Sequence, residues 1–445
     1  MTSDSISRLQ SKLATAAQAV ARVRSGDRVF VHGGCATPSG LVDALVQRAP
    51  ELRDVLVCHL HTEGPATYAA PGYEQSFRHV ALFVGSNTRD AVNSGRAEYI
   101  PAFLSEVPSM FRSGRLPIDV ALLNLSAPDA HGFCSLGVSV DVAMAAARAA
   151  KTVIAQINTA MPRTHGASFI HIDQIDAAVE VHIPPVALQP ARLSATDEKI
   201  GAFVAGLVED QSTLQLGIGS IPNAVLAALG GHKDLAIHSE MFSDGVMALV
   251  DAGVITARYN PIHPGKLITS FLMGSERLYA FADDNPGLEM HPADYTNDTA
   301  VIRRNHRMIA VNSAIEIDLT GQVCSSSIGE RIYSGFGGQV DFMRGATLAD
   351  NGRSILALPA TARGGVESRI VGRLRPGAMV TLTQAHVRFV VTEFGVADLY
   401  GRTLRERAAA LISIAHPSFR DDLFAFARDH NLAGHPIAVP PLPNG

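Results

Sequence analysis

The stretch STLQLGIGSIPNAVLAALGG, residues 212–231, indicates the fold class of this chain. It runs from the apolar residues of a strand, through two glycines and a proline, into an apolar helical pattern. An earlier stretch, DRVFVHGGCATPSGLVDALVQR at 27–48, has the same order. Both place a Leu seven positions after the Pro. A strand–glycine–helix unit that occurs twice predicts an α/β protein.

Short apolar strands also alternate with helical patterns along the first half. They are expected at 55–57, 79–84, 120–125 and 152–157. Such strands, separated by helices, predict a mostly parallel sheet that is covered on both faces. An amphipathic helix is expected earlier, over residues 5–24, because Leu9, Leu13, Ala16, Val20 and Val23 recur at helical spacing.

A second pair of similar sequence segments supports a duplicated fold. NLSAPDAHGFCSLG (124–137) and NSAIEIDLTGQVCSSSIG (312–329) each carry Asn, then Asp, then Gly and Cys-Ser in a hairpin-like pattern. We therefore expect two related open-sheet α/β domains. The alternative is that strand–glycine–helix turns recur in any α/β protein. The proline-rich segment 182–199 indicates a connection between an N-terminal domain, 1–187, and a C-terminal domain, 188–445.

The composition argues against several classes of protein. The 445 residues are 47% apolar, which suffices for a substantial core, so disorder and a coiled coil are poor interpretations. Only 18% are charged, which fits an oligomer that hides part of its surface. Lys and Arg number 37 against 42 Asp and Glu, giving a net charge of −5. This balance predicts no general attraction to nucleic acid or to anionic lipid.

The cysteines and the N-terminus predict a compartment. The four cysteines (Cys35, Cys58, Cys134 and Cys324) lie far apart, which argues against a disulfide framework or a zinc ribbon. The opening MTSDSISRLQSKL has no basic and apolar regions typical of a secretory signal. No apolar run approaches the roughly 18 residues of a membrane span. We expect a soluble, reduced, cytoplasmic protein.

The glycine-rich turn GIGSIP, residues 217–222, is the first candidate for chemistry. It follows a strand, and Pro222 suits the first position of a helix. Glycines at such a turn let backbone N–H groups approach an anion at the helix N-terminus. The third glycine of a nicotinamide-binding fingerprint is missing. A plain tight turn is the alternative.

The segment IHSEMFSDG, residues 237–245, places Glu240 between an apolar strand and a helix. Active sites gather at such strand ends in α/β sheets. A carboxylate there suits a nucleophile or a general base. The alternative is an acid that only stabilises the helix N-terminus through the helix dipole.

The loop SGFGGQVDF, residues 334–342, is the third candidate. Three glycines in four positions permit close approach of backbone to a ligand or to another segment, and both remain open. Gln339 is a candidate donor to a developing oxyanion. Cys58-His59-Leu60-His61 has two metal-ligand types but no acidic cluster nearby, so no metal site is expected.

Together these segments resemble the acetyl-CoA hydrolase/transferase family, a branch of the class I CoA-transferases that includes 4-hydroxybutyrate CoA-transferases. The resemblance covers nearly the whole chain. It rests on YIPAFLSEVP (99–108), MPRTHGASFIH (161–171), GIGSIPNAV (217–225), HSEMFSDG (238–245), SGFGGQVDFMRGA (334–346), VTEFGVADLYGR (391–402) and LISIAHPSFR (411–420).

The resemblance implies two α/β domains, a homodimer and roles for named residues. Glu240 corresponds to the family's nucleophile. The residues that correspond to CoA contacts are Gly217, Ile218, Gly219, Ser220, Ile221, Asn312, Ile315, Gly335 and Gly338. Backbone N–H groups of the 217–221 turn and the side chain of Gln339 are the expected oxyanion donors.

The activity implied is transfer of CoA between an acyl-CoA and a short-chain carboxylate of the acetate, butyrate or 4-hydroxybutyrate type. It would run by ping-pong kinetics through a glutamyl-CoA thioester on Glu240. CoA is then a substrate, and no cofactor is expected. An acyl-CoA hydrolase that uses the same intermediate is the alternative. A non-catalytic CoA- or nucleotide-binding regulator is the third interpretation.

Overall fold

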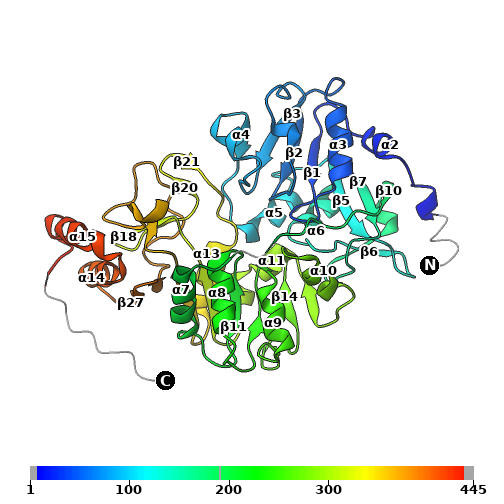
Figure 1. The fold of residues 1–445 in the computed structure, drawn as a ribbon. Helices are drawn as coiled ribbons and strands as arrows, with labels where there is room; N and C mark the ends of the chain where they lie inside the picture. Colours follow the sequence, from blue (N-terminus) through cyan, green and yellow to red (C-terminus); the bar gives the residue numbers. More distant parts are fainter. Residues whose placement is uncertain (1–7, 190–191, 435–445) are drawn as a thin grey trace.

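A computed structural model describes residues 8–189 and 192–434 as a mixed α/β fold with two main sheets (Figure 1). The first sheet and its helices, in blue and cyan, come from the first 181 residues. The second sheet, in green to orange, comes from residues 213–398. Within the described residues, no helix has the length and apolarity needed to cross a membrane.

The first sheet has seven strands in the order β10-β7-β5-β1-β2-β3-β4, and all neighbours run parallel. Its strands are β1 (Arg28–Val31), β2 (Val55–His59), β3 (Phe77–Ala81), β4 (Ala97–Tyr99), β5 (Val120–Ser126), β7 (Thr152–Asn158) and β10 (Ala177–Val181).

Strand β1 shows why the sheet needs cover on both faces. Val29 and Val31 pack in one apolar cluster with Leu41 and Leu45 of helix α3 (Ser39–Gln47). Phe30 packs on the opposite side, in the cluster that contains α5 (Val107–Arg112) and α6 (Ala143–Ala149). The predicted parallel, doubly covered sheet is confirmed.

The second sheet has six strands in the order β12-β11-β17-β22-β26-β27. They are β11 (Thr213–Leu216), β12 (Ala236–Ile237), β17 (Met308–Asn312), β22 (Arg353–Ala357), β26 (Phe389–Thr392) and β27 (Gly395–Asp398). Only the last pair is antiparallel. A parallel bridge from His238 to Ile268 leads on to β14 (Leu267–Thr269). Strand β14 pairs with β16 (Leu288–Met290), which pairs with β8 (His165–Gly166) from the first half.

The two sheets share one strand order. In the first sheet the order β3-β2-β1-β5-β7 has α3 after β1. In the second, β14-β12-β11-β17-β22 has α8 (Ser220–Ala228) after β11. The second pair of similar segments, 124–137 and 312–329, falls at equivalent places in the two sheets. Strand β6 (Phe133–Ser135) follows β5, whereas β18 (Glu316–Asp318) and β19 (Val323–Cys324) follow β17. This correspondence is what the predicted duplication requires.

The helix expected over residues 5–24 is wrong in its extent. Leu13 forms a parallel bridge with Ala178 on β10, and the N–H of Ala14 donates to the carbonyl oxygen of Ala178 at 2.9 Å. Thr15 then caps a short helix, α2 (Ala16–Val20). Pairing with the sheet edge therefore interrupts the helical periodicity, and residues 5–7 lie outside the described residues.

Helix α7 (Ala195–Ala205) opens the second half of the chain, and the side chain of Ser194 caps it by accepting from the N–H of Asp197. The other α-helices named below or drawn in Figure 1 are α4 (Arg89–Asn93), α9 (Gly245–Asp251), α10 (Glu276–Ala282), α11 (Ala293–Thr296), α12 (Thr299–Ile302), α13 (Gln339–Leu348), α14 (Leu404–Ile414) and α15 (Pro417–Asp429). Helices α7, α8 and α9 lie side by side over the second sheet (Figure 1).

The contact between α7 and α8 depends on Gly201. A Cβ atom there would lie 2.6 Å from the backbone carbon and oxygen of Ala224. We expect Gly201→Ala to lower the free energy of unfolding by about 1–3 kcal/mol, because the helices must separate. Gly206→Ala is the matched control at the end of the same helix, where φ is −64° and the nearest atom is 3.5 Å away. That control should gain about 0.4–1 kcal/mol. Urea unfolding that shows Gly201→Ala to be as stable as the control would contradict this packing argument.

Candidate active site

Glu240 lies at the carboxyl end of β12, between that strand and β13 (Met241–Phe242). Its backbone is fixed from two sides. The carbonyl oxygen of Glu240 accepts hydrogen bonds from the N–H groups of Ser270, at 2.9 Å, and Phe271, at 3.1 Å. The hydroxyl of the preceding Ser239 donates to the carbonyl oxygen of Leu216 at 3.1 Å. The strand end thus holds the acid in one orientation.

The carboxylate of Glu240 has a specific side-chain donor. Nδ2 of Asn297 donates to Oε2 of Glu240 at 2.9 Å. Asn297 follows helix α11, and its own Oδ1 accepts from the hydroxyl of Thr296 at 2.8 Å, so its amide donor faces the acid. Nε2 of His238 donates to the carbonyl oxygen of Thr296 at 2.9 Å. This chain of contacts ties the donor to the strand that carries the acid.

Gly338 packs directly over this pair, at the start of helix α13. A Cβ atom at Gly338 would lie 1.9 Å from Oε2 of Glu240 and 2.1 Å from Nδ2 of Asn297. Atoms that are not bonded to each other cannot approach so closely. Only glycine therefore lets this loop cover the carboxylate.

Burial raises the pKa of Glu240 to about 7. The hydrogen bonds from Asn297 and from the backbone of Gly338 oppose this shift, whereas the charges of Asp341 and Asp141 add to it. Burial also raises the pKa of Asp341 to about 7. A carboxyl group with such a pKa is ionised in a substantial fraction of molecules near neutral pH, while it lacks the full hydration that blunts nucleophilicity.

The predicted glycine turn lies beside this acid. Strand β11 pairs with β12 on one side and with β17 on the other, so the turn that follows β11 is flanked by the ends of both neighbours. Gly219 has φ of +119°, a conformation that favours glycine. The side chain of Ile218 is 42% exposed. Helix α8 begins at Ser220, so Pro222 is its third residue and not its first as expected.

The other residues assigned from the sequence spread over two regions. Asn312 ends β17, and its Nδ2 donates to Oε1 of Gln215 at 3.0 Å. Ile315 lines a separate pocket of about 470 Å³ together with Tyr333 and three arginines. A Cβ at Gly335 would lie 3.0 Å from the ring of Phe83, so the glycine loop packs on the first half of the chain.

Gln339 has a different partner from the one expected. Its Nε2 donates to the carbonyl oxygen of Ser313 at 2.8 Å, so the side chain bridges to the loop after β17. The amide is engaged there in this structure. Its role as an oxyanion donor stays a prediction.

Two residues that the sequence did not single out complete the site. Asn297 holds the carboxylate, yet its surroundings, DYTNDTA, match no motif. Asp341 stands in the quoted glycine-loop segment but was not assigned a role. Its Oδ1 accepts from the hydroxyl of Ser105 at 2.9 Å, so the first half of the chain contributes to the surroundings of Glu240. The available signal in the sequence was a single charged residue, Asp341, close after three glycines in SGFGGQVDF.

Comparison with known proteins places this chain in a family. Two family models match, the acetyl-CoA hydrolase/transferase N-terminal domain over residues 3–190 and the C-terminal domain over residues 274–427. Glu240 lies between the matched segments. The chain is 51% identical to 4-hydroxybutyrate coenzyme A transferase of Clostridium kluyveri, over 93% of this chain and 96% of that protein. It is 47% identical to a succinyl-CoA:acetate/propanoyl-CoA:succinate CoA transferase of Fasciola hepatica, over 92% of this chain and 86% of that one.

A solved structure supports the same family as these sequence matches. The fold superposes on 4-hydroxybutyrate CoA-transferase of Porphyromonas gingivalis with a TM-score of 0.82 and 39% identity, over 95% of this chain and 98% of that one. On these matches of sequence and fold, the chain belongs to the acetyl-CoA hydrolase/transferase family.

Proposed function

We propose that this protein transfers CoA between an acyl-CoA and a short-chain carboxylate, with Glu240 as the nucleophile. One observation carries the assignment of the residue. Glu240 is a partly buried strand-end carboxylate whose pKa is raised to about 7 and whose Oε2 is held by Asn297 beneath Gly338. The named activities of the family relatives supply the reaction class.

The reaction would proceed in two similar halves. A carboxylate oxygen of Glu240 attacks the thioester carbonyl of the acyl-CoA, and the C–S bond breaks to give a mixed anhydride and CoA thiolate. The thiolate then attacks the Glu240 carbonyl carbon, which forms a glutamyl-CoA thioester and releases the first acid as its carboxylate. A second carboxylate reverses these steps and leaves as the new acyl-CoA. Bonds of similar energy are exchanged, so no ATP is required, and the kinetics are ping-pong.

Each tetrahedral intermediate carries an oxyanion that needs N–H donors. The backbone of the 217–221 turn is the first candidate, because it lies beside Glu240 at the start of helix α8. One such donor contributes about 2.7–4 kcal/mol in well-studied enzymes. Gln339 is the second candidate, which requires that its amide leave Ser313.

The remaining parts of the proposal follow the family. CoA contacts are assigned to residues 217–221, Asn312, Ile315, Gly335 and Gly338, with CoA as substrate and no separate cofactor. We also propose a cytoplasmic homodimer. The N-terminal domain would span 1–187 and the C-terminal domain, with Glu240, would span 188–445.

Glu240→Gln should abolish CoA exchange, lowering the rate by on the order of 10⁴–10⁶, because an amide cannot form the thioester. Intact-protein mass spectrometry after incubation with acetyl-CoA should show a CoA adduct on the wild type and none on the variant. Borohydride should remove the adduct and leave an alcohol at position 240, located by peptide mapping. An active variant with no deamidation back to Glu would refute the assignment.

A turnover assay with and without an added carboxylate separates the two activities of this family. Acyl-CoA consumed only when a carboxylate acceptor is added supports the transferase. Equal consumption without an acceptor would favour the hydrolase. CoA binding with neither adduct nor turnover would favour a non-catalytic binding protein.

Gly338→Ala should reduce kcat/KM by about 100-fold or more, because the new methyl group must displace Glu240 or Asn297 from contact. Gly231→Ala is the control, since a Cβ there meets nothing within 4 Å. Steady-state kinetics with acetyl-CoA check both variants. Equal activity of Gly338→Ala and the control would show that the loop does not cover the reacting acid.

The acid limb of the kcat/KM profile should have its midpoint near pH 7, because the nucleophile must be ionised. Activity should fall tenfold per pH unit below that midpoint. Asp341→Asn removes a negative charge that raises the pKa of Glu240, so its midpoint should move to lower pH. Asp251→Asn, at an exposed acid paired with Arg277, should leave the midpoint unchanged. A wild-type midpoint near 4.5 would contradict a buried nucleophile.

A further inference from the structure

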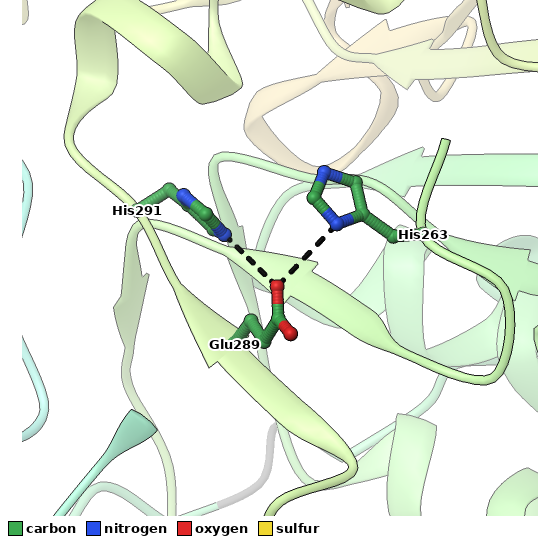
Figure 2. A group of neighbouring side chains, drawn as sticks. All are labelled: His263, Glu289 and His291. Carbon is green, nitrogen blue, oxygen red and sulfur yellow. Dashed lines mark hydrogen bonds and ion pairs between the residues drawn. The ribbon is translucent and has the colours of Figure 1, made fainter. Parts of the chain in front are cut away.

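Two histidines and one glutamate converge outside the Glu240 site (Figure 2). His263 precedes β14, Glu289 lies on β16, and His291 follows β16 directly. Nδ1 of His263 lies 3.4 Å from Oε2 of Glu289, and Nε2 of His291 lies 3.2 Å from the same oxygen. One ligand atom from each residue lies within 4.8 Å of the other two. Figure 2 shows both imidazole rings directed at the carboxylate.

These separations match the spacing of two ligand atoms on one shared metal ion. Zinc–nitrogen and zinc–oxygen bonds are about 2.0–2.2 Å, and tetrahedral geometry then sets neighbouring ligand atoms about 3.3–3.5 Å apart. Hydrogen bonds from N–H donors to oxygen span about 2.7–3.2 Å. The 3.2 Å contact of His291 is a hydrogen bond at the long end of that range, the 3.4 Å contact of His263 lies beyond it, and both distances are close to the edge of a zinc tetrahedron.

The surroundings of the three side chains favour the same interpretation. Nε2 of His263 lies 2.6 Å from the hydroxyl of Tyr295, which leaves Nδ1 directed at Glu289. Ligating histidines in zinc sites are oriented in this way by a partner on the opposite ring nitrogen. The ring of His291 stacks on that of Tyr295 at 4.7 Å between centroids. Nζ of Lys266 lies 3.8 Å from the other oxygen of Glu289, so Oε2 is the one left for a metal.

We propose that Nδ1 of His263, Oε2 of Glu289 and Nε2 of His291 bind one Zn²⁺ ion, with water as the fourth ligand. The three residues are partly exposed, so an ion can enter from solvent. The role is structural. His291 and Tyr295 lie on the segment that leads to Asn297, the donor to Glu240, so the ion would pin that segment to the loop before β14. The sequence predicted no metal site, since the histidines are separated by 27 intervening positions and form no spacing motif.

Isothermal titration of the full-length, tag-free, chelator-treated protein with ZnCl₂ tests the site. The wild type should bind about one equivalent, and His263→Gln and His291→Gln should lose that binding. Tyr295→Phe keeps all three ligands and should weaken binding by about tenfold, because it removes only the orienting partner. X-ray absorption of the zinc complex should show two imidazole nitrogens and oxygen ligands at about 2.0–2.2 Å.

His171→Gln is the matched control, because His171 also lies beside a carboxylate, 3.3 Å from Oδ2 of Asp173, but belongs to no group of three such ligands among the described residues. It should bind zinc as the wild type does. Zinc should raise the melting temperature of the wild type and of this control, but not of the two ligand variants. Far-UV circular dichroism without metal establishes that the variants are folded.

A wild type that binds no zinc would overturn the proposal. Equal binding by the wild type and both folded ligand variants would also overturn it, because the zinc would then be held elsewhere. If the ligand variants do not fold, the zinc affinity of Tyr295→Phe and the X-ray absorption spectrum of the wild-type zinc complex decide the test. An unchanged affinity together with fewer than two imidazole ligands would refute the site.

Discussion

The carboxylate of Glu240 is partly buried at the end of β12 with its Oε2 held by Asn297, and this contact constrains the segments around it. A buried carboxylate is costly unless a donor meets it, and a donor that is too strong would make it a poor nucleophile. Hydrogen bonds from the Asn297 amide and the Gly338 backbone lower the pKa of Glu240, whereas burial and the charge of Asp341 raise it. The balance leaves the pKa of Glu240 at about 7. The glycine at 338 follows from the same contact, because no side chain fits above it.

Parallel sheet topology explains why these parts meet. Strands β11, β12 and β17 run in the same direction, so their carboxyl ends deliver the glycine turn, Glu240 and Asn312 to one edge. The equivalent strand order in the first sheet delivers loops toward the same region, which is how Phe83 and Ser105 come to contact the 335–341 segment. A duplicated fold thus surrounds one acid with segments from both halves.

The segment from β16 through helix α11 to Asn297 joins the Glu240 site to the proposed zinc site. Its first part carries Glu289 and His291, and its last residue is the donor to Glu240. The carbonyl oxygen of His291 also accepts from Ser270, whose N–H donates to the carbonyl oxygen of Glu240. A constraint on His291 would therefore act on the acid from both its backbone and its side-chain partner.

The sequence by itself determined the α/β class, the parallel sheet, and the candidate acid and glycine loops, because strand and helix periodicity and glycine turns are local properties of the chain. It assigned Glu240 and Gly338 through family resemblance, and local reasoning alone left Glu240 open. Only the tertiary structure decided that Leu13 pairs with β10 and that Gln339 contacts Ser313. It also decided that Asn297 contacts Glu240, that Asp341 contacts Ser105, and that His263, Glu289 and His291 converge. Those contacts join residues up to 236 positions apart, as Ser105 and Asp341 are. Their geometry depends on how the sheets and loops pack, which no local pattern encodes.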